Sequence, residues 1–366
     1  MALSRKHMAS TGSILGVTAL LLAGCGAAPE ESSSASSENS DYLGCIVSDF
    51  GGFNDKSFNQ NSYKGLKDAV SEYGIKFKEA ESSSEPEYGP NVNQMVQAGC
   101  NLTITVGFAL ADTTKEVATA NPDMHFTIVD DNSIELDNVR PIVFDTAQAA
   151  FQAGYLAAAQ TKTGKVATYG GAEFPTVTIF MDGFAQGVAY YNEQKGADVE
   201  VLGWNTEAQS GTFTGDFEDA GKGKTNTQTF LDQGADIILP VAGPVGIGTL
   251  EAVQEYNSTN PENTASVIWV DSDGVETNPN FSSIIMTSIM KKMDAAVTET
   301  IKADMDGNFT NEAYVGTLEN DGVGLAPFHD FDSQISDEIK ADLDKIKEDI
   351  ISGTIKVETA GSPTNQ

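Results

Sequence analysis

Short apolar runs that alternate with amphipathic stretches are the feature that most restricts the fold of this chain of 366 residues. Strands buried on both faces that alternate with helices predict parallel sheets with right-handed crossovers, an α/β fold. The predicted strands are Leu43–Val47, Leu102–Val106, His125–Val129, Lys165–Tyr169, Asp236–Leu239 and Ser266–Val270. The predicted helices include Ser62–Tyr73, Gln148–Gln160, Gly183–Gln194 and Gly248–Tyr256.

This pattern runs twice, with a seam around Asn138 to Thr146. The chain after residue 41 is also longer than one hydrophobic core usually organises, so we predict two lobes joined by a hinge. Three later segments extend the plan: a helix over Met290–Asp304, a strand and loop over 312–328, and a helix over Ser336–Ile351. The predicted lobes are 42–145, completed by about 284–308 and 333–358, and 146–283, completed by about 309–332.

The first 41 residues have the composition of an export signal and a tether. Arg5 and Lys6 precede an apolar stretch over Ile14–Ala23 that is too short to span a bilayer. The ending Leu-Ala-Gly-Cys resembles the bacterial lipoprotein box, in which Cys25 becomes the lipidated N-terminus. Residues 1–24 are therefore predicted to be a signal peptide. The Ser- and Glu-rich segment 25–41 is predicted to be a flexible tether outside the cytoplasm.

Charge and cysteine content limit the partners and the compartment. The formal net charge is −32, which repels nucleic acid, and no basic stripe offsets it. Cys45 and Cys100 each lie near the start of a predicted strand. If those strands are neighbours, a disulfide outside the cell is one outcome, and two buried thiols are the other.

Unusual residues gather where the predicted strands end. In open α/β sheets, ligands bind beyond the carboxyl ends of the strands. Facing loops from two lobes therefore predict a cleft that closes on a small molecule. The segments at these ends are "SDFGGFNDKSFN", "GFALAD", "DD" at 130–131, "PVAGPVGIG" and "VDSDG".

The segment Ser48–Leu66 has the most distinctive chemistry. Gly51 and Gly52 allow backbone angles that a Cβ would forbid, and Asp49 can accept hydrogen bonds from a pair of hydroxyls. Phe58 offers a flat apolar face, although core packing is its common alternative. For Asp55 the N-cap of the following helix is the preferred interpretation.

The segment "SDFGGFNDKSFNQNSYKGL" resembles the signature of the basic membrane protein family, the substrate-binding lipoproteins of ABC transporters of the purine nucleoside receptor type. The likeness continues in order through "NPDMHFTIVD", "MDGFAQGV", "LDQGADIILPVAG", "IWVDSD" and "TSIMKKMDAAV". It implies a type I periplasmic-binding-protein fold, with two Rossmann-like lobes joined by a hinge. It also implies a purine nucleoside as ligand and an ABC permease as partner.

The resemblance also implies a set of ligand-binding residues. Asp49, Asp271 and Lys291 match groups that bind ribose hydroxyls, Phe58 a ring that stacks on the base, and Asn59 a neighbouring polar contact. The remaining matches are Asp130, with Asp131 left open beside it, and the cleft-lining Gly107, Phe108 and Gly243. Leu239 departs from the family, in which many relatives carry an aromatic second stacking partner. Trp269 and Phe217 are the candidate substitutes.

Other chemistries lack their motifs in the sequence. No histidine has metal-ligand spacing, no nucleophile elbow is present, and no cofactor is implied. The expectation is a monomeric, lipid-anchored extracytoplasmic binding protein that is not an enzyme. The alternatives are the same fold binding a free sugar or a signalling molecule, and a surface enzyme acting on nucleosides.

Overall fold

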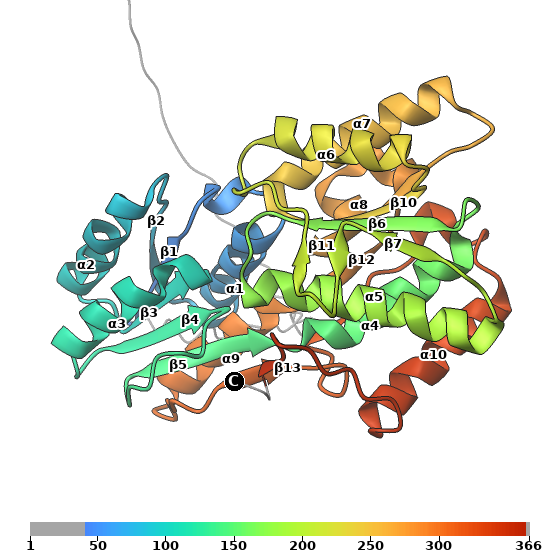
Figure 1. Ribbon diagram of the computed structural model, residues 1–366. Helices are drawn as coiled ribbons and strands as arrows, with labels where there is room; N and C mark the ends of the chain where they lie inside the picture. Colours follow the sequence, from blue (N-terminus) through green and yellow to red (C-terminus); the bar gives the residue numbers. More distant parts are fainter. Residues whose placement is uncertain (1–40, 364–366) are drawn as a thin grey trace, which may run out of the picture. The chain divides into compact units, whose positions relative to one another are not determined.

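The computed structural model describes residues 41–363. The predicted signal peptide 1–24, the lipidation site Cys25 and all but the last residue of the predicted tether 25–41 lie outside this range. Within the described range, no helix is long and apolar enough to cross a membrane. Two six-stranded sheets organise these residues (Figure 1).

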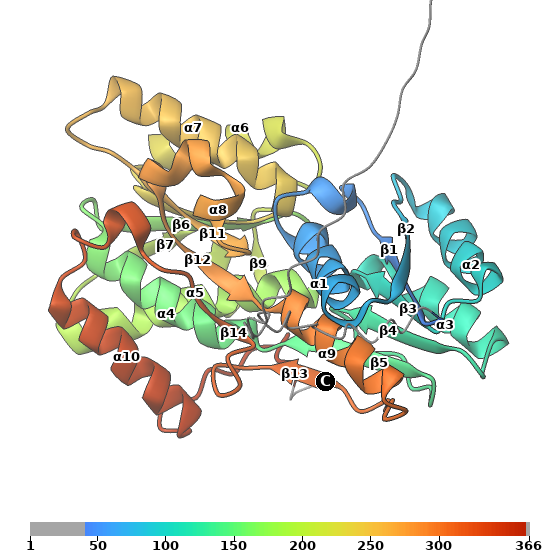
Figure 2. The same cartoon turned by 180° about the vertical axis from the view of Figure 1, so that it is seen from behind.

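The first sheet is parallel throughout. Its strand order is β13 (Tyr314–Gly316), β5 (Val139–Phe144), β4 (His125–Val129), β3 (Leu102–Val106), β1 (Leu43–Ser48) and β2 (Lys76–Ala80). Helices α2 (Tyr88–Ala98) and α3 (Ala111–Ala120) cover one face, and α1 (Phe58–Tyr73) and α9 (Met293–Met305) pack together on the other (Figure 2). The central strands are buried on both faces because each face carries a helical layer.

The second sheet repeats this plan with one antiparallel edge. Its order is β14 (Val323–Leu325), β12 (Ile285–Lys291), β11 (Ser266–Asp271), β10 (Ile237–Val241), β6 (Lys165–Gly170) and β7 (Glu200–Leu202), and β14 is the antiparallel strand. Helices α4 (Thr146–Gln160) and α5 (Pro175–Lys195) cover one face, and α6 (Ala220–Asp232) and α7 (Gly246–Thr259) the other (Figure 1). The remaining elements are α8 (Gly274–Thr277), α10 (Asp337–Ile351) and the pair β8 (Trp204–Asn205) and β9 (Ser210–Gly211).

All six strands predicted from the sequence are present, as β1, β3, β4, β6, β10 and β11. The strands that were missed lack a continuous apolar run. Edge strand β2 is largely exposed and reads KFKEA, and β5 contains Arg140 and Pro141. The predicted seam at 138–146 is therefore mostly strand β5, and the chain leaves the first sheet only after Phe144.

The chain passes between the sheets three times, at 144–146, 291–293 and 316–323, which we call the hinge crossovers. They are bonded to one another: the Asp145 N–H donates to Gly316 O at 2.8 Å, and the Lys292 N–H donates to Gly322 O at 2.9 Å. A Cβ on Gly322 would lie 2.4 Å from the Cα of Gly316, so this close approach requires glycine.

The predicted lobe boundaries in the last third of the chain need three corrections. The segment from 284 was assigned to the first lobe, but β12 pairs with β11, so the crossing falls after Lys291 and the helix begins at Met293 rather than Met290. The segment 309–332 was assigned to the second lobe, but β13 pairs with β5 of the first sheet. Strand pairing decides both cases, and apolar periodicity carries no information about which sheet a strand joins.

The third correction concerns α10, which was assigned to the first lobe with 333–358. It packs instead on α4 of the second, where Gln152 Nε2 donates to Leu343 O at 2.9 Å and the Tyr155 hydroxyl donates to Asp342 Oδ2 at 2.6 Å. The periodicity of α10 predicts an apolar face, and packing against α4 decides which lobe covers it.

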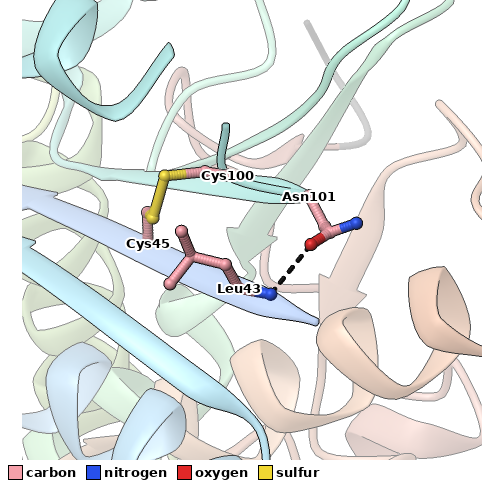
Figure 3. Close-up of a disulfide and its surroundings, with 4 residues drawn as sticks. All are labelled: Leu43, Cys45, Cys100 and Asn101. Carbon is pink, nitrogen blue, oxygen red and sulfur yellow. Dashed lines mark hydrogen bonds between the residues drawn. A yellow bond between two sulfur atoms is a disulfide. The ribbon is translucent and has the colours of Figure 1, made fainter. Parts of the chain in front are cut away.

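The structure joins Cys45 and Cys100 by a disulfide (Figure 3). Cys45 lies on β1, and Cys100 lies just before β3, the parallel neighbour of β1, with 6.0 Å between their Cα atoms. Next to it, the Leu43 N–H donates to Asn101 Oδ1 at 2.8 Å. The bond closes a loop with a sequence separation of 55 residues that contains α1, β2 and α2.

Reduction of this disulfide should lower the free energy of unfolding by up to about 4 kcal/mol, because it restores the loop entropy of the unfolded chain. Urea unfolding with and without dithiothreitol measures the effect. The Cys45→Ser/Cys100→Ser double variant is the control and should not respond to the reductant. Identical unfolding curves of the unsubstituted protein under both conditions would show that the two thiols are not bonded.

Candidate functional site

A cavity lies where the carboxyl ends of β1, β3 and β4 of the first sheet meet those of β10, β11 and β12 of the second. It holds about 680 Å³ of space not filled by atoms, part of which is open to solvent. The lining includes all nine residues predicted to bind ligand: Asp49, Phe58, Asn59, Gly107, Phe108, Asp130, Gly243, Asp271 and Lys291. Sequence positions that are up to 242 residues apart thus share one cavity, because parallel strands bring their carboxyl ends to the same edge of a sheet.

The loop after β1 is shaped by two glycines and a capping aspartate. Gly51 and Gly52 have φ of 93° and 62°, which glycine adopts without strain. The Asp55 carboxylate accepts the backbone N–H groups of Ser57 at 3.0 Å, Asn59 at 2.7 Å and Gln60 at 2.9 Å. Asp55 therefore satisfies the first N–H groups of α1 from two residues before the N-cap, which is Ser57 rather than the predicted Asp55, and it also lines the cavity.

The same loop binds the second sheet directly. The Ser57 hydroxyl donates to Asp271 Oδ2 at 2.8 Å, and Asn61 Nδ2 donates to Lys291 O at 2.8 Å. The residues that approach the ends of β11 and β12 therefore come from the first turn of α1 and the residue before it. The loop serves both as a wall of the cavity and as a contact between the two lobes.

Asp130 and Asp271 occupy equivalent positions in the two sheets. Each ends a Val-Asp pair at the tip of the fourth strand counted from the β2 or β7 edge. Their φ angles are 67° and 68°, in the left-handed region that non-glycine residues rarely adopt. Such conformations cost of order 1–3 kcal/mol and concentrate at functional sites. This structural duplication was not visible in the sequence, in which only Val-Asp is shared.

Lys291 carries the one ammonium group that lines the cavity among the described residues, and it is 2% exposed. It forms an ion pair with Asp130 across the lobes. The ammonium nitrogen also lies 5.0 Å from the centroid of the Phe58 ring, 5.4 Å from that of Phe144 and 5.7 Å from that of Phe180. These rings exclude water from the pair and attract the cation through their π faces.

Burial makes the cavity carboxyls harder to ionise. It raises the pKa of Asp49 to about 8, although the hydrogen bond from Asn59 acts in the opposite direction. It raises the pKa of Asp271 to about 6, opposed by the charge of Lys291 and the hydrogen bond from Ser57. Burial also raises the pKa of Asp130 against the attraction of Lys291. Carboxyls with such raised pKa values favour a partner that donates hydrogen bonds to them.

Asn59 presents an unused acceptor. Its Nδ2 donates to Asp49 Oδ1 at 2.8 Å and to Phe50 O at 3.0 Å. Its Oδ1 is buried and has no hydrogen-bond partner among the described residues. A buried polar atom without a partner costs about 1–3 kcal/mol, so a donor group on a ligand would be stabilised there.

Glycine at position 107 permits the observed place of Asp49. Gly107 has a φ of 111°, and a Cβ there would lie 2.1 Å from Asp49 Oδ2. Gly243 differs, because nothing lies within 4 Å of its Cβ position. Asp131, which the sequence left open beside Asp130, does not line this cavity; its carboxylate accepts the Ser133 N–H at 3.0 Å.

The aromatic wall was the part of the site that sequence reasoning mostly missed. Phe174 and Phe180 line the cavity together with Phe217, which was one of the two candidate stacking residues. Ring centroids are 5.1 Å apart for Phe108 and Phe174, and 6.2 Å apart for Phe174 and Phe217, which run nearly parallel at 24°. Position 174 precedes Pro175 at the start of α5, a pattern that marks a helix start and gives no signal for binding.

The prediction of Trp269 as the other candidate stacking residue is wrong. Trp269 is fully buried on the opposite face of the second sheet, against Gly246 and Gly274, and does not line the cavity. Leu239 is fully buried in the core and does not line it either. No group of three or more His, Cys, Asp or Glu within 41–363 is arranged to hold a metal ion.

Replacing Asp49 with Asn should stabilise the ligand-free protein increasingly as the pH rises from about 4 to 8. The folded state binds the Asp49 proton more tightly than the unfolded state, so the unsubstituted protein loses stability over this range. For Asp271→Asn the gain should level off near pH 6. Urea unfolding at several pH values measures both. The exposed Asp123→Asn is the control, and pH profiles parallel to it for both variants would contradict the assignment.

Comparisons with known proteins agree with this architecture. A sequence model of the family described as ABC transporter substrate-binding protein PnrA-like matches residues 44–360. The ABC transporter nucleoside-binding protein BmpA of Lactococcus lactis is 30% identical over 369 residues, which cover 96% of this chain and 99% of that protein. Basic membrane protein A of Borreliella burgdorferi is 30% identical over 312 residues, 84% of this chain and 85% of that protein.

Solved structures give the same result for the fold. The crystal structure of an ABC transporter solute-binding protein from Aeropyrum pernix has a TM-score of 0.77 and 26% identity, and covers 87% of this chain and 93% of that one. The two-lobe periplasmic-binding-protein fold expected from the sequence is thereby confirmed. Proteins of this kind bind small ligands and pair with permease and ATPase subunits. The family match over most of the length shows that the chain belongs to the PnrA-like, or basic membrane protein, family of ABC transporter substrate-binding proteins.

Proposed function

We propose that this protein captures a purine nucleoside outside the cytoplasm and delivers it to an ABC importer. The observation that carries the proposal is one cavity that is lined both by carboxyls from the two lobes and by several phenylalanine rings. A nucleoside can use both kinds of residue, because its ribose offers hydroxyl donors and its base offers a flat apolar face.

The carboxyl side suits a ribose. Asp49 and Asp271 come from different lobes, and hydrogen bonds from ribose hydroxyls would favour the ionised form of each carboxyl, which accepts at both oxygens without donating. Charge-assisted hydrogen bonds of this type are about twice as strong as neutral ones. Lys291 offsets the repulsion between the acids and can itself donate to a hydroxyl oxygen.

The phenylalanine side suits a heterocycle. Phe58 comes from the first lobe and Phe174 and Phe217 from the second, so a base bound between them would contact rings of both. Base stacking on aromatic side chains contributes about 1–3 kcal/mol per base in nucleic acid binders. The unpaired Asn59 Oδ1 offers an acceptor for an N–H group on a base edge.

The alternatives explain less of the cavity. A free sugar or another small polar ligand would use the carboxyls and leave the rings at 108, 174 and 217 without a role. An enzyme acting on nucleosides would need a positioned nucleophile or activated water, and the family consists of binding proteins. The BmpA relative is described as nucleoside-binding, which supports the proposed ligand class.

Delivery would depend on lobe closure. A ligand held by residues of both lobes favours the closed state by the difference of its affinities for the two states. The permease would then recognise the closed arrangement. Anchoring through Cys25, which lies outside the described residues, would keep the protein as a monomer at the membrane surface. Mass spectrometry of the mature N-terminal peptide tests the proposed lipidation of Cys25, and an unmodified peptide would refute it.

A thermal-shift screen should find nucleosides among the stabilising ligands and leave ribose and free bases with little effect. A ligand at 100 times its Kd stabilises the native state by about 2.7 kcal/mol. The screen compares guanosine, inosine, adenosine and cytidine with ribose and the free bases. A shift with ribose but with no nucleoside would favour the free-sugar alternative, and formation of free base on incubation would favour an enzyme.

Two substitutions separate the two halves of the site. Asp271→Asn should weaken nucleoside binding roughly 10- to 150-fold, because hydrogen bonds to charged groups contribute about 1.5–3 kcal/mol. Phe58→Leu should weaken it by about 1–3 kcal/mol through lost stacking. Calorimetry measures both. The controls are Asp123→Asn and Phe53→Leu, since Phe53 lies in the same loop but packs on Tyr63 outside the cavity. Losses of equal size in the controls would contradict the roles assigned.

A further inference from the structure

The segment after α10 returns to the centre of the molecule. Gly353, with a φ of 74°, follows the helix, and in Figure 1 the dark-red chain then runs back along α5 toward β13. We call residues 357–363 the C-terminal tail. Its Glu358 O accepts a hydrogen bond from Gln186 Nε2 of α5 at 3.1 Å.

Four of the seven tail residues are buried, whereas Glu358 and Ala360 are exposed. Val357, Thr359 and Ser362 are 8%, 7% and 1% exposed. A Cβ on Gly361 would lie 2.4 Å from Pro175 O and 3.1 Å from Ile179 Cβ, so the tail backbone rests directly on the first turns of α5. Chain ends are usually poorly ordered unless they are tied down, and this degree of burial indicates a defined position.

The tail also forms one wall of a second cavity behind the ligand site. Gly361 and Pro363 line it together with residues of both lobes, such as Val143 and Ile179. The second cavity shares four lining residues with the ligand cavity: Phe108, Asp130, Thr176 and Lys291. Both cavities therefore reach the Lys291–Asp130 ion pair, and we call the side that the tail lines its rear.

The tail reaches the hinge as well. The Ser362 hydroxyl donates to Asp145 Oδ1 at 3.4 Å, and Asp145 belongs to the first hinge crossover. The backbone of Asp145 is hydrogen-bonded to the third hinge crossover through Gly316 O. The third crossover is in turn hydrogen-bonded to the second crossover through Gly322 O. A segment held by α5 of the second lobe thus contacts a connected set of backbone hydrogen bonds that must adjust when the lobes open.

We infer that the C-terminal tail is part of the ligand-binding machinery: it closes the rear of the cavity and braces the hinge crossovers, so that bound ligand is retained longer. The inference rests on the proposed function. With the tail in place, water is kept from the Lys291–Asp130 pair, and an ion pair is stronger in a dry environment than in water. Without it, the pair would be hydrated from behind and opening would meet less resistance.

Two variants test the tail, and a third is the matched control. A chain ending at Glu358 removes the part of the tail that touches Asp145 and the second cavity. Gly361→Ala keeps the full length but forces the tail away from Pro175. Gly89→Ala makes the same substitution at a position where nothing lies within 4 Å of the added Cβ.

Hydrogen exchange of the ligand-free proteins is the first measurement. The Asp145 and Lys292 amides should exchange at least about threefold faster in both tail variants and not in the control. The amides of Thr103 and Ile104 on β3 should be unchanged, which separates a loosened hinge from general destabilisation. Equal exchange at Asp145 and Lys292 in all proteins would overturn the bracing role, and this readout does not depend on any nucleoside.

Nucleoside dissociation is the second measurement. The nucleoside with the largest thermal shift should leave the tail variants at least about fivefold faster than the unsubstituted protein, with a smaller change in association, because most affinity changes appear in the dissociation rate. Unchanged dissociation from both tail variants would overturn the inference while leaving the proposed function intact. An unsubstituted protein that binds no nucleoside at all would instead refute the proposed function.

Discussion

The ion pair between Lys291 and Asp130 is the interaction on which the site depends. Lys291 ends β12 of the second sheet and Asp130 follows β4 of the first, so the pair exists only when the lobes are close together. Buried charges are costly unless they are paired, and removing one partner leaves the other uncompensated. The pair therefore joins the two lobes in the closed arrangement, and the phenylalanine rings around the ammonium keep water away from it.

The remaining acids favour a ligand that donates hydrogen bonds to them. Asp49 and Asp271 add two carboxyls to a cavity with one ammonium group among the described residues. Burial raises the pKa of both, so the empty closed cavity either holds protons or opens to water. A ligand rich in hydroxyl groups would supply hydrogen bonds in place of those protons. The same electrostatics would thus link lobe closure without ligand to proton uptake, and ligand binding to proton release.

The sequence predicted the acidic residues of the cavity better than its aromatic residues. Asp49, Asp130 and Asp271 could be found because they follow apolar strand sequences directly, and strand ends mark the ligand edge of a parallel sheet. Phe174 could not, because its position before Pro175 marks only a helix start. Phe180 could not, because nothing in the periodicity of α5 separates a core phenylalanine from one that lines a cavity. The tail gave no signal either, since its contacts with α5 and Asp145 are long-range.

By itself, the sequence determined the α/β class, six of the strands, the role of Asp55 at the start of α1 and the edge of the sheets at which polar residues line a cavity. These features follow from local periodicity, from glycine and capping chemistry, and from the rule that parallel strands share one carboxyl edge. Only the tertiary structure decided which sheet receives β12 and β13, which lobe α10 covers, and which of two adjacent residues enters the cavity. Those outcomes depend on pairing and packing between segments that are distant in sequence, where a shift of one residue reverses the face that a side chain presents.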